Sequence, residues 1–197
     1  MSGPLLGVDA PPSNVNGRTT SITLFTVQRW WGRFAMPVMF FLTRKFPRML
    51  GDMDTLSFIS YGSWTLYKHI PYNGPPQRLH KLRLHHMLFE VHFNGSWDIY
   101  VDASVRILTR GMNFFWSSSL GFPKPLPGHG FKAFFREHEV NTSHYYCAYP
   151  EATVTMTRSA LALEPKLDAL TSKAKDLDPE QFGASWAKFL QDAQHLV

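Results

Sequence analysis

The residues best suited to acid–base or metal chemistry lie between positions 80 and 92. There, His80, His85, His86 and His92 surround one carboxylate, Glu90. In an extended strand alternate side chains share a face, so His86, Glu90 and His92 are expected to project together. The Cα atoms of Glu90 and His92 are then about 7 Å apart, which suits proton exchange or a shared metal ion. His86 and His92 are about 20 Å apart and cannot hold the same ion.

A third ligand or proton-transfer partner has to come from another segment, and His69 and His144 are the candidates. Sets of histidine and carboxylate suit iron or zinc. A buried glutamate paired with histidine is also a common structural arrangement. The sequence thus predicts Glu90, His92 and His144 as catalytic candidates, with iron, haem or no cofactor left open.

Cys147, the only cysteine, follows His144 by three residues and suggests a nucleophile with its base. Residues three apart in a strand point to opposite faces, so we expect Cys147 to act as a small hydrophobic residue. A single cysteine also excludes a disulfide framework and a thiolate zinc cluster. The GxSxG, GxGxxG, GxxxxGK[ST] and HExxH patterns are absent, so no motif points to a hydrolase, a dinucleotide or nucleotide binder, or a zinc protease.

Aromatic residues are abundant, at 15% of the chain, and several fall on the expected strands. Ligand pockets are mostly apolar with a few polar groups. The sequence therefore predicts a lipophilic pocket whose polar groups are the three catalytic candidates, and ordinary core packing is the alternative. The predicted ligand-binding residues are Tyr61, Trp64, Phe89, Phe93 and Tyr146.

The elements that must position these residues follow from the apolar pattern. Strands are expected over 55–67, 81–93 and 144–149, and the second is expected to be central because both of its faces are apolar. Helices are expected over 97–116 with Ser96 as N-cap, near Phe131, over 154–163 with a second start at 164, and after Asp178. The predicted fold class is α+β, a mainly antiparallel sheet with helices on one side, of the ferredoxin-like or dimeric α+β barrel type.

The predicted domain organisation has four parts. A flexible tail over 1–20 precedes a basic aromatic helix over 21–48, an α+β core over 49–163, and C-terminal helices over 164–197 that pack on the core.

The basic aromatic segment contains the excess positive charge. Residues 1–50 hold six basic side chains against Asp9 alone, and the rest of the chain is balanced, so this segment accounts for the net charge of +5. Its longest uncharged run has ten residues, from Phe34 to Thr43, whereas about twenty are needed to span a bilayer. The pattern suits a helix lying in a membrane interface, or a helix that covers the sheet or forms a dimer contact. The predicted membrane-surface residues are Arg29, Trp30, Trp31, Arg33, Phe40, Phe41, Arg44 and Lys45.

The charge balance and the start of the chain bear on partners and location. A body without net charge is a poor nucleic-acid platform, so no nucleic-acid partner is expected. The N-terminal residues lack the pattern of a secretory signal, so we expect a cytoplasmic protein, peripheral at the inner membrane face if the basic helix binds lipid.

Two segments carry a resemblance to a known family. FEVHFNGSWDIYVDA (89–103) and HYYCAYPEATVTM (144–156) resemble a family of uncharacterised bacterial proteins, with an overlap over residues 55–163. The resemblance implies an α+β, ferredoxin-like fold, similar in architecture to dye-decolorising peroxidases and small dimeric monooxygenases. The family brings no established activity, and fold alone does not fix function.

Three functions therefore stand as expectations. The first is an α+β protein that binds a lipophilic small molecule, with the basic helix attaching it to an anionic membrane surface or a partner. The second is an oxidoreductase that uses Glu90 and His92, with iron, haem or no cofactor. The third is a non-catalytic interaction protein that forms a homodimer through its first helix.

Overall fold

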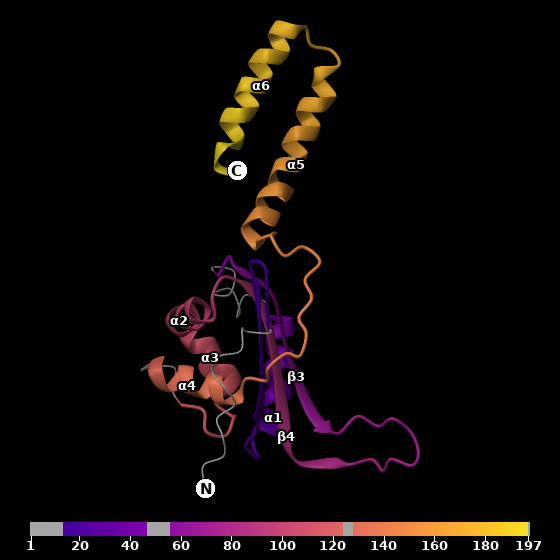
Figure 1. Cartoon of the computed structure of the whole chain (residues 1–197), viewed down its shortest axis with the longest axis vertical. Coiled ribbons are helices and arrows are strands. Elements are labelled where there is room, and N and C mark those ends of the chain that lie inside the picture. Colours follow the sequence, from indigo (N-terminus) through magenta and orange to yellow (C-terminus); the bar gives the residue numbers. More distant parts are fainter. Residues whose placement is uncertain (1–13, 47–55, 124–127, 197) are drawn as a thin grey trace. The chain divides into compact units, whose positions relative to one another are not determined.

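The computed structural model describes residues 14–46, 56–123 and 128–196. The chain divides into two compact units, Met1–Glu151 and Ala152–Val197, and each is described by itself. The first unit is an α+β domain with a four-stranded antiparallel open sheet (Figure 1). The second unit is built from helices alone over its described residues.

The sheet has the strand order β1-β2-β4-β3, and every neighbouring pair is antiparallel. β4 (Lys81–Asn94) pairs along its length with β2 (Thr19–Val27) and with β3 (Ile59–His69), whereas β1 (Val15–Asn16) is a short strand at the edge. The prediction that the strand over 81–93 is central is therefore confirmed.

β2 corrects the prediction of a helix that begins at Ser21. Residues 19–27, TTSITLFTV, are rich in β-branched side chains and bury Ile22, Leu24 and Thr26 at alternate positions, which is the period of a strand. The helix of this region, α1, covers only Gly32–Lys45. The predicted tail over 1–20 overlaps β1 and the start of β2, and its first thirteen residues, like residues 47–55, lie outside the described part of the chain.

Three helices cover one face of the sheet (Figure 1). Ser96 caps α2 (Trp97–Ile107) by accepting a hydrogen bond from the backbone N–H of Ile99, as predicted. The helix predicted over 97–116 breaks at Leu108 into α2 and α3 (Thr109–Trp116). The helix expected near Phe131 is α4 (Gly128–His138).

Aromatic rings fill the core between sheet and helices. Alternate residues of β4, from Met87 to Phe93, are buried on this face. Phe93 stacks on Tyr100 of α2 with ring centroids 4.3 Å apart, and Trp64 of β3 stacks on Phe115 of α3 at 4.7 Å. Met36 and Met39 join α1 to the same core.

The segment over 144–149 is irregular rather than the predicted strand. β1 already occupies the free edge of β2 at Thr19 and Thr20, and the chain after α4 pairs with that edge at Thr23 and Leu24. The segment instead reaches the turn between β1 and β2, where the backbone N–H of Arg18 donates to the Pro150 carbonyl at 2.8 Å.

The second unit is a helical hairpin of α5 (Val154–Ala174) and α6 (Pro179–Ala193), followed by the short 3₁₀ helix η2 (Gln194–Leu196). Asp178 caps α6 in a capping box with Gln181, as its position before Pro179 predicts. α5 continues through Pro165, so the second helix start predicted there is wrong. The boundary between the two compact units lies at residues 151–152.

Candidate functional site

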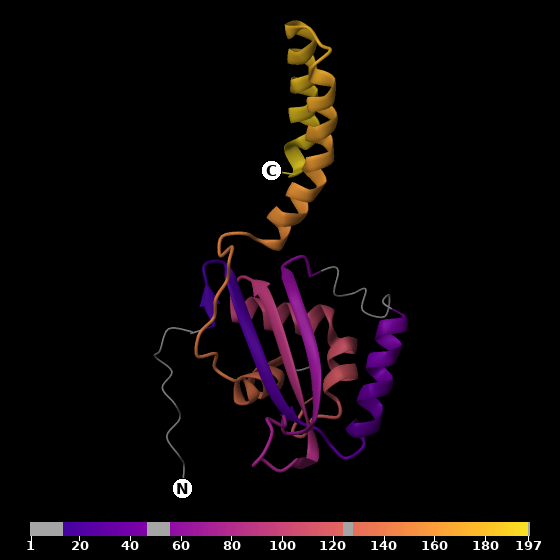
Figure 2. The same ribbon diagram turned by 90° about the vertical axis from the view of Figure 1, so that its right-hand side faces the viewer.

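One face of the sheet is left uncovered by α2, α3 and α4 (Figure 2). The even-numbered residues of β4 belong to this face because the odd-numbered ones are buried beneath the helices. Residues directly opposite in an antiparallel pair share a face, so the strand register gives the neighbours. This open sheet face consists of Ser21, Thr23, Phe25, Val27, Tyr61, Ser63, Thr65, Tyr67, His86, Leu88, Glu90 and His92.

Glu90 and His92 lie on the open sheet face together, as predicted from strand parity. Ser63 Oγ donates to Glu90 Oε2 at 3.4 Å. His92 Nδ1 lies 3.1 Å from the Tyr145 hydroxyl, and its ring also contacts Tyr61 with centroids 5.3 Å apart. Burial lowers the pKa of His92 below its usual value of 6.5, and the opposing effect of the Glu90 charge is smaller. His92 is therefore a neutral imidazole at neutral pH, a form that can accept a proton.

His144, the third predicted catalytic residue, is exposed on the irregular segment. Its neighbour Tyr145 is the residue that contacts His92. The contact of Tyr145 with His92 joins positions 53 residues apart, and no local spacing signals it. Over the described residues, no group of three or more His, Cys, Asp or Glu side chains is placed to hold a metal ion.

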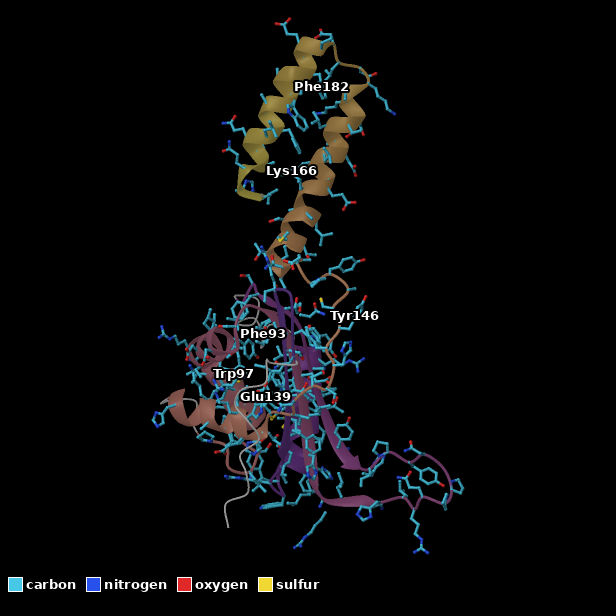
Figure 3. The ribbon with its side chains drawn as sticks, viewed as in Figure 1. Phe93, Trp97, Glu139, Tyr146, Lys166 and Phe182 are labelled. Carbon is cyan, nitrogen blue, oxygen red and sulfur yellow. The ribbon has the colours of Figure 1, made fainter. Side chains whose placement is uncertain are left out.

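The predicted pocket residues are divided between the two faces of the sheet. Trp64, Phe89 and Phe93 belong to the core, where Trp64 and Phe89 lie with ring centroids 5.0 Å apart. Tyr61 lies on the open sheet face, and Tyr146 is 75% exposed. Figure 3 shows Phe93 and Tyr146 on opposite sides of the sheet. These five residues therefore do not line one cavity.

The predicted membrane-surface residues in and next to α1 do not all lie on the same face of the helix. Trp30, Phe34, Val38 and Phe41 follow each other at helical spacing and are between 57% and 73% exposed, and we call them the outer stripe. On the opposite face Met36 and Met39 are buried.

Of the aromatic residues predicted to meet the membrane, Trp30 and Phe41 lie on the outer stripe. Phe40 instead packs toward Phe115 with ring centroids 6.4 Å apart, and Trp31 is half-buried. Val38 was not predicted. Its signal was present in the i, i+4, i+7 spacing from Phe34 to Phe41, with Val38 between them.

The four predicted basic residues are all exposed: Arg29, Arg33, Arg44 and Lys45. The Arg33 guanidinium lies over the Phe34 ring at 4.7 Å, and the Lys45 ammonium is 6.0 Å from the Phe41 ring centroid. None of the four forms an ion pair with a residue in the described parts of the chain. No helix among these residues is both long enough and apolar enough to cross a membrane.

A buried polar cluster fixes the start of α1. Gln28 Nε2 donates to Thr26 Oγ1 at 3.2 Å and to Ser119 Oγ at 3.0 Å, and Ser118 Oγ donates to Gln28 Oε1. All four side chains are buried and hydrogen-bonded to one another, so the cluster is satisfied internally. It joins the end of β2 to the chain after α3, and α1 begins four residues beyond Gln28.

Comparisons with protein-family models, curated proteins and solved structures find no match to this chain. The resemblance to an uncharacterised bacterial family thus stays a prediction, and no activity is transferred from a relative.

Proposed function

We propose that α1 attaches the α+β unit to an anionic membrane surface. The observation that carries the proposal is the exposure of the outer stripe together with four exposed basic side chains that form no ion pair with a residue the structure describes. A helix of this kind lies in the interface with its apolar side chains at the acyl boundary and its cations at the headgroups. Location at the cytoplasmic membrane face, where anionic lipids concentrate, belongs to the same proposal.

The placement of charge on α1 supports an external anion. Arg44 and Lys45 in the last turn stabilise the helix by opposing its dipole. Arg29 and Arg33 lie at the opposite end, where positive charge is unfavourable, and the first turn has no acidic residue. Helix stability therefore explains only half of the basic residues, whereas an anionic surface attracts all four.

Vesicle sedimentation tests the proposal. The full chain is expected to pellet with vesicles of equimolar phosphatidylcholine and phosphatidylglycerol, and less with phosphatidylcholine alone. Phe34→Ser with Phe41→Ser should weaken binding at least about tenfold, because each removes an apolar side chain from the interface. Arg33→Gln with Lys45→Gln should weaken binding to the anionic vesicles alone, by about thirtyfold, since each cation contributes about 1 kcal/mol.

Ile99 provides the matched control. It is an exposed apolar residue on α2 of the same unit, but its neighbours Asp98 and Asp102 are acidic. Ile99→Ser should leave vesicle binding unchanged. Equal losses in Ile99→Ser and in the outer-stripe variant would contradict attachment through α1.

The open sheet face supports a second proposal, acid–base or ligand-binding chemistry at His92. The observation that favours it is a neutral imidazole in hydrogen-bond contact with Tyr145 and beside Glu90. Phe25, Tyr61 and Tyr67 on the same face supply apolar contacts for a lipophilic ligand. Metal analysis and a visible absorption spectrum of the untagged protein test the oxidoreductase form, and a haem or iron signal lost in His92→Gln supports it.

The ferredoxin-like and dimeric arrangement is also a proposal. An uncovered sheet face is the surface through which a second copy would complete such a dimer. Light scattering of the full chain tests it, and a monomer at high protein concentration would contradict it.

A further inference from the structure

The end of β3, the start of β4 and the connection between them form an arm, residues 68–83, which we call the basic arm. His69 pairs with Lys81, and the backbone N–H of Ile70 donates to the His80 carbonyl at 3.1 Å. At the tip, Gln77 Nε2 donates to the Pro71 carbonyl at 2.9 Å, and Gln77 Oε1 accepts from the backbone N–H of Asn73 at 2.9 Å. The arm extends away from the sheet and from the helices that cover it (Figure 1).

All charged side chains of the basic arm are positive. Its exposed cations are Lys68, Arg78, Lys81 and Arg83. The sequence contains no aspartate or glutamate between Asp54 and Glu90. None of these four cations forms an ion pair with any residue that the structure describes. The arm is therefore a concentrated positive surface, whereas the other residues after position 50 hold ten basic and fourteen acidic side chains.

Apolar side chains accompany this charge. Ile70, Tyr72 and Leu79 are between 45% and 59% exposed, and none belongs to the core cluster. Exposed hairpins are usually protected from unwanted association by polar and charged residues. Two aliphatic residues and one tyrosine among four cations instead match the acyl boundary and the headgroups of a bilayer.

The arm begins beside the start of α1. The backbone N–H of Gln28 donates to the His85 carbonyl at 2.8 Å, which joins the base of the arm to the chain that enters α1. Burial lowers the pKa of His85 first, and the charges of Lys68 and Arg33 lower it further, so both cations lie near this ring. The start of α1 and the arm lie at the same end of the sheet (Figure 2).

We propose that the basic arm is a second contact with an anionic bilayer, in which Tyr72 and Leu79 enter the interface and the four cations bind headgroup phosphates. The choice of an anionic bilayer as the partner rests on the proposed function of α1. The arm is a different site from α1. Two linked contacts on one rigid unit strengthen each other, because the first holds the second at high effective concentration. A nucleic acid offers the same phosphate charge but no apolar phase for Ile70 and Leu79.

The full chain is tested with vesicles of equimolar phosphatidylcholine and phosphatidylglycerol. Tyr72→Ser with Leu79→Ser should weaken binding at least about tenfold, and Arg78→Gln with Lys81→Gln should weaken it about thirtyfold. The matched control is Arg106→Gln with Arg110→Gln, which removes two exposed cations from the helix-covered side and should have no effect. These positions lie outside the core, so the melting temperature is expected to stay at the wild-type value.

The outcomes separate this inference from the proposal for α1. If both arm variants bind vesicles as tightly as the wild type, the proposed membrane contact of the arm is overturned, whatever the α1 variants do. Loss in the arm variants with wild-type binding in the α1 variants supports the arm and overturns attachment through α1. If the arm variants keep vesicle binding but lose binding to a short DNA duplex, the arm is a nucleic-acid site and the inference fails.

Discussion

His92 lies on the open sheet face with one nitrogen against the Tyr145 hydroxyl. Because burial lowers its pKa below 6.5, the folded protein prefers the neutral ring more strongly than the unfolded chain does. His92 therefore stabilises the fold fully above pH 6.5. As the pH falls, the unfolded chain takes up a proton first, and this contribution disappears by the pH at which the folded ring is protonated. The free energy of unfolding should decrease over this interval.

His92→Gln should reduce that decrease, since glutamine does not titrate. Chemical denaturation of wild type and variant at a series of pH values measures it. The pKa of His85 is lowered in the same direction, so part of the decrease should remain. His144→Gln, at a histidine exposed on the irregular segment, is the matched control. A steeper profile in His92→Gln would contradict the sign argued here.

Gly32 shows how closely the start of α1 packs on the buried polar cluster. A Cβ at this position would lie 2.9 Å from Ser118 Cβ and 3.2 Å from Gln28 Oε1. Both neighbours are held by hydrogen bonds, so Gly32→Ala should destabilise the first unit by about 1–3 kcal/mol. Gly111 in α3 has no such neighbour within 4 Å, and Gly111→Ala should stabilise the unit by about 0.5–1 kcal/mol. Thermal denaturation followed by circular dichroism compares the two.

The sequence predicts single residues well where a local period governs them. Strand alternation placed Glu90 and His92 on one face, and both lie on the open sheet face. The same alternation places Phe89 and Phe93 beneath the helices, on the opposite face of the sheet from Tyr61. These three residues therefore cannot line one pocket. The contact of Tyr145 with His92 depends on how the chain returns after α4, which no residue spacing encodes.

At the scale of elements, the adjacent residues Phe40 and Phe41 allow a direct test of which face of α1 packs on the core and which is exposed. Phe40 packs toward Phe115, whereas Phe41 is exposed. Phe40→Ala should lower the free energy of unfolding by about 2 kcal/mol, because it leaves a cavity beside the core. Phe41→Ala should change it by less than about 0.5 kcal/mol and should instead weaken binding to anionic vesicles. Reversed effects in the two variants would mean that the outer stripe is misassigned.

Most elements followed from the sequence because their signals are local. A run with apolar residues on both faces predicted β4, and Ser96 and Asp178 marked the starts of α2 and α6. β2 was hidden because its residues precede the apolar run of α1 with a single glycine, Gly32, and no proline between them. The irregular course of 144–149 depends on which strand edge is free, and edge occupancy is a property of the assembled sheet.

At the scale of the whole molecule, the positive charge belongs to the first unit. Residues 152–197 hold five basic and six acidic side chains, so the net charge of +5 comes entirely from the residues before them. α1 and the basic arm lie on this unit, and the start of α1 and the arm lie at the same end of its sheet. The chain thus separates a positively charged α+β unit from a nearly neutral helical hairpin.

The helical hairpin has little core of its own. Leu170 and Ala193 are its buried apolar residues over the part that the structure describes. Four large apolar side chains remain between 39% and 48% exposed: Leu167, Phe182, Trp186 and Leu190. Two helices that bury so little are marginal, because helix stability in proteins comes mainly from packing.

Hydrogen exchange should therefore separate the two units. Amides of α5 and α6 are expected to open with free energies below about 3 kcal/mol, whereas those of Met87, Phe89 and Val91 in β4 should exchange only through global unfolding. Exchange followed by mass spectrometry on peptides from both units measures this in the full chain. Trp186→Ala gives the internal check: it should speed exchange in α5, which shares the hairpin, and leave β4 unchanged. Protection of α5 equal to that of β4 would mean that the exposed apolar residues are covered in solution, since two isolated helices cannot supply so large an opening free energy.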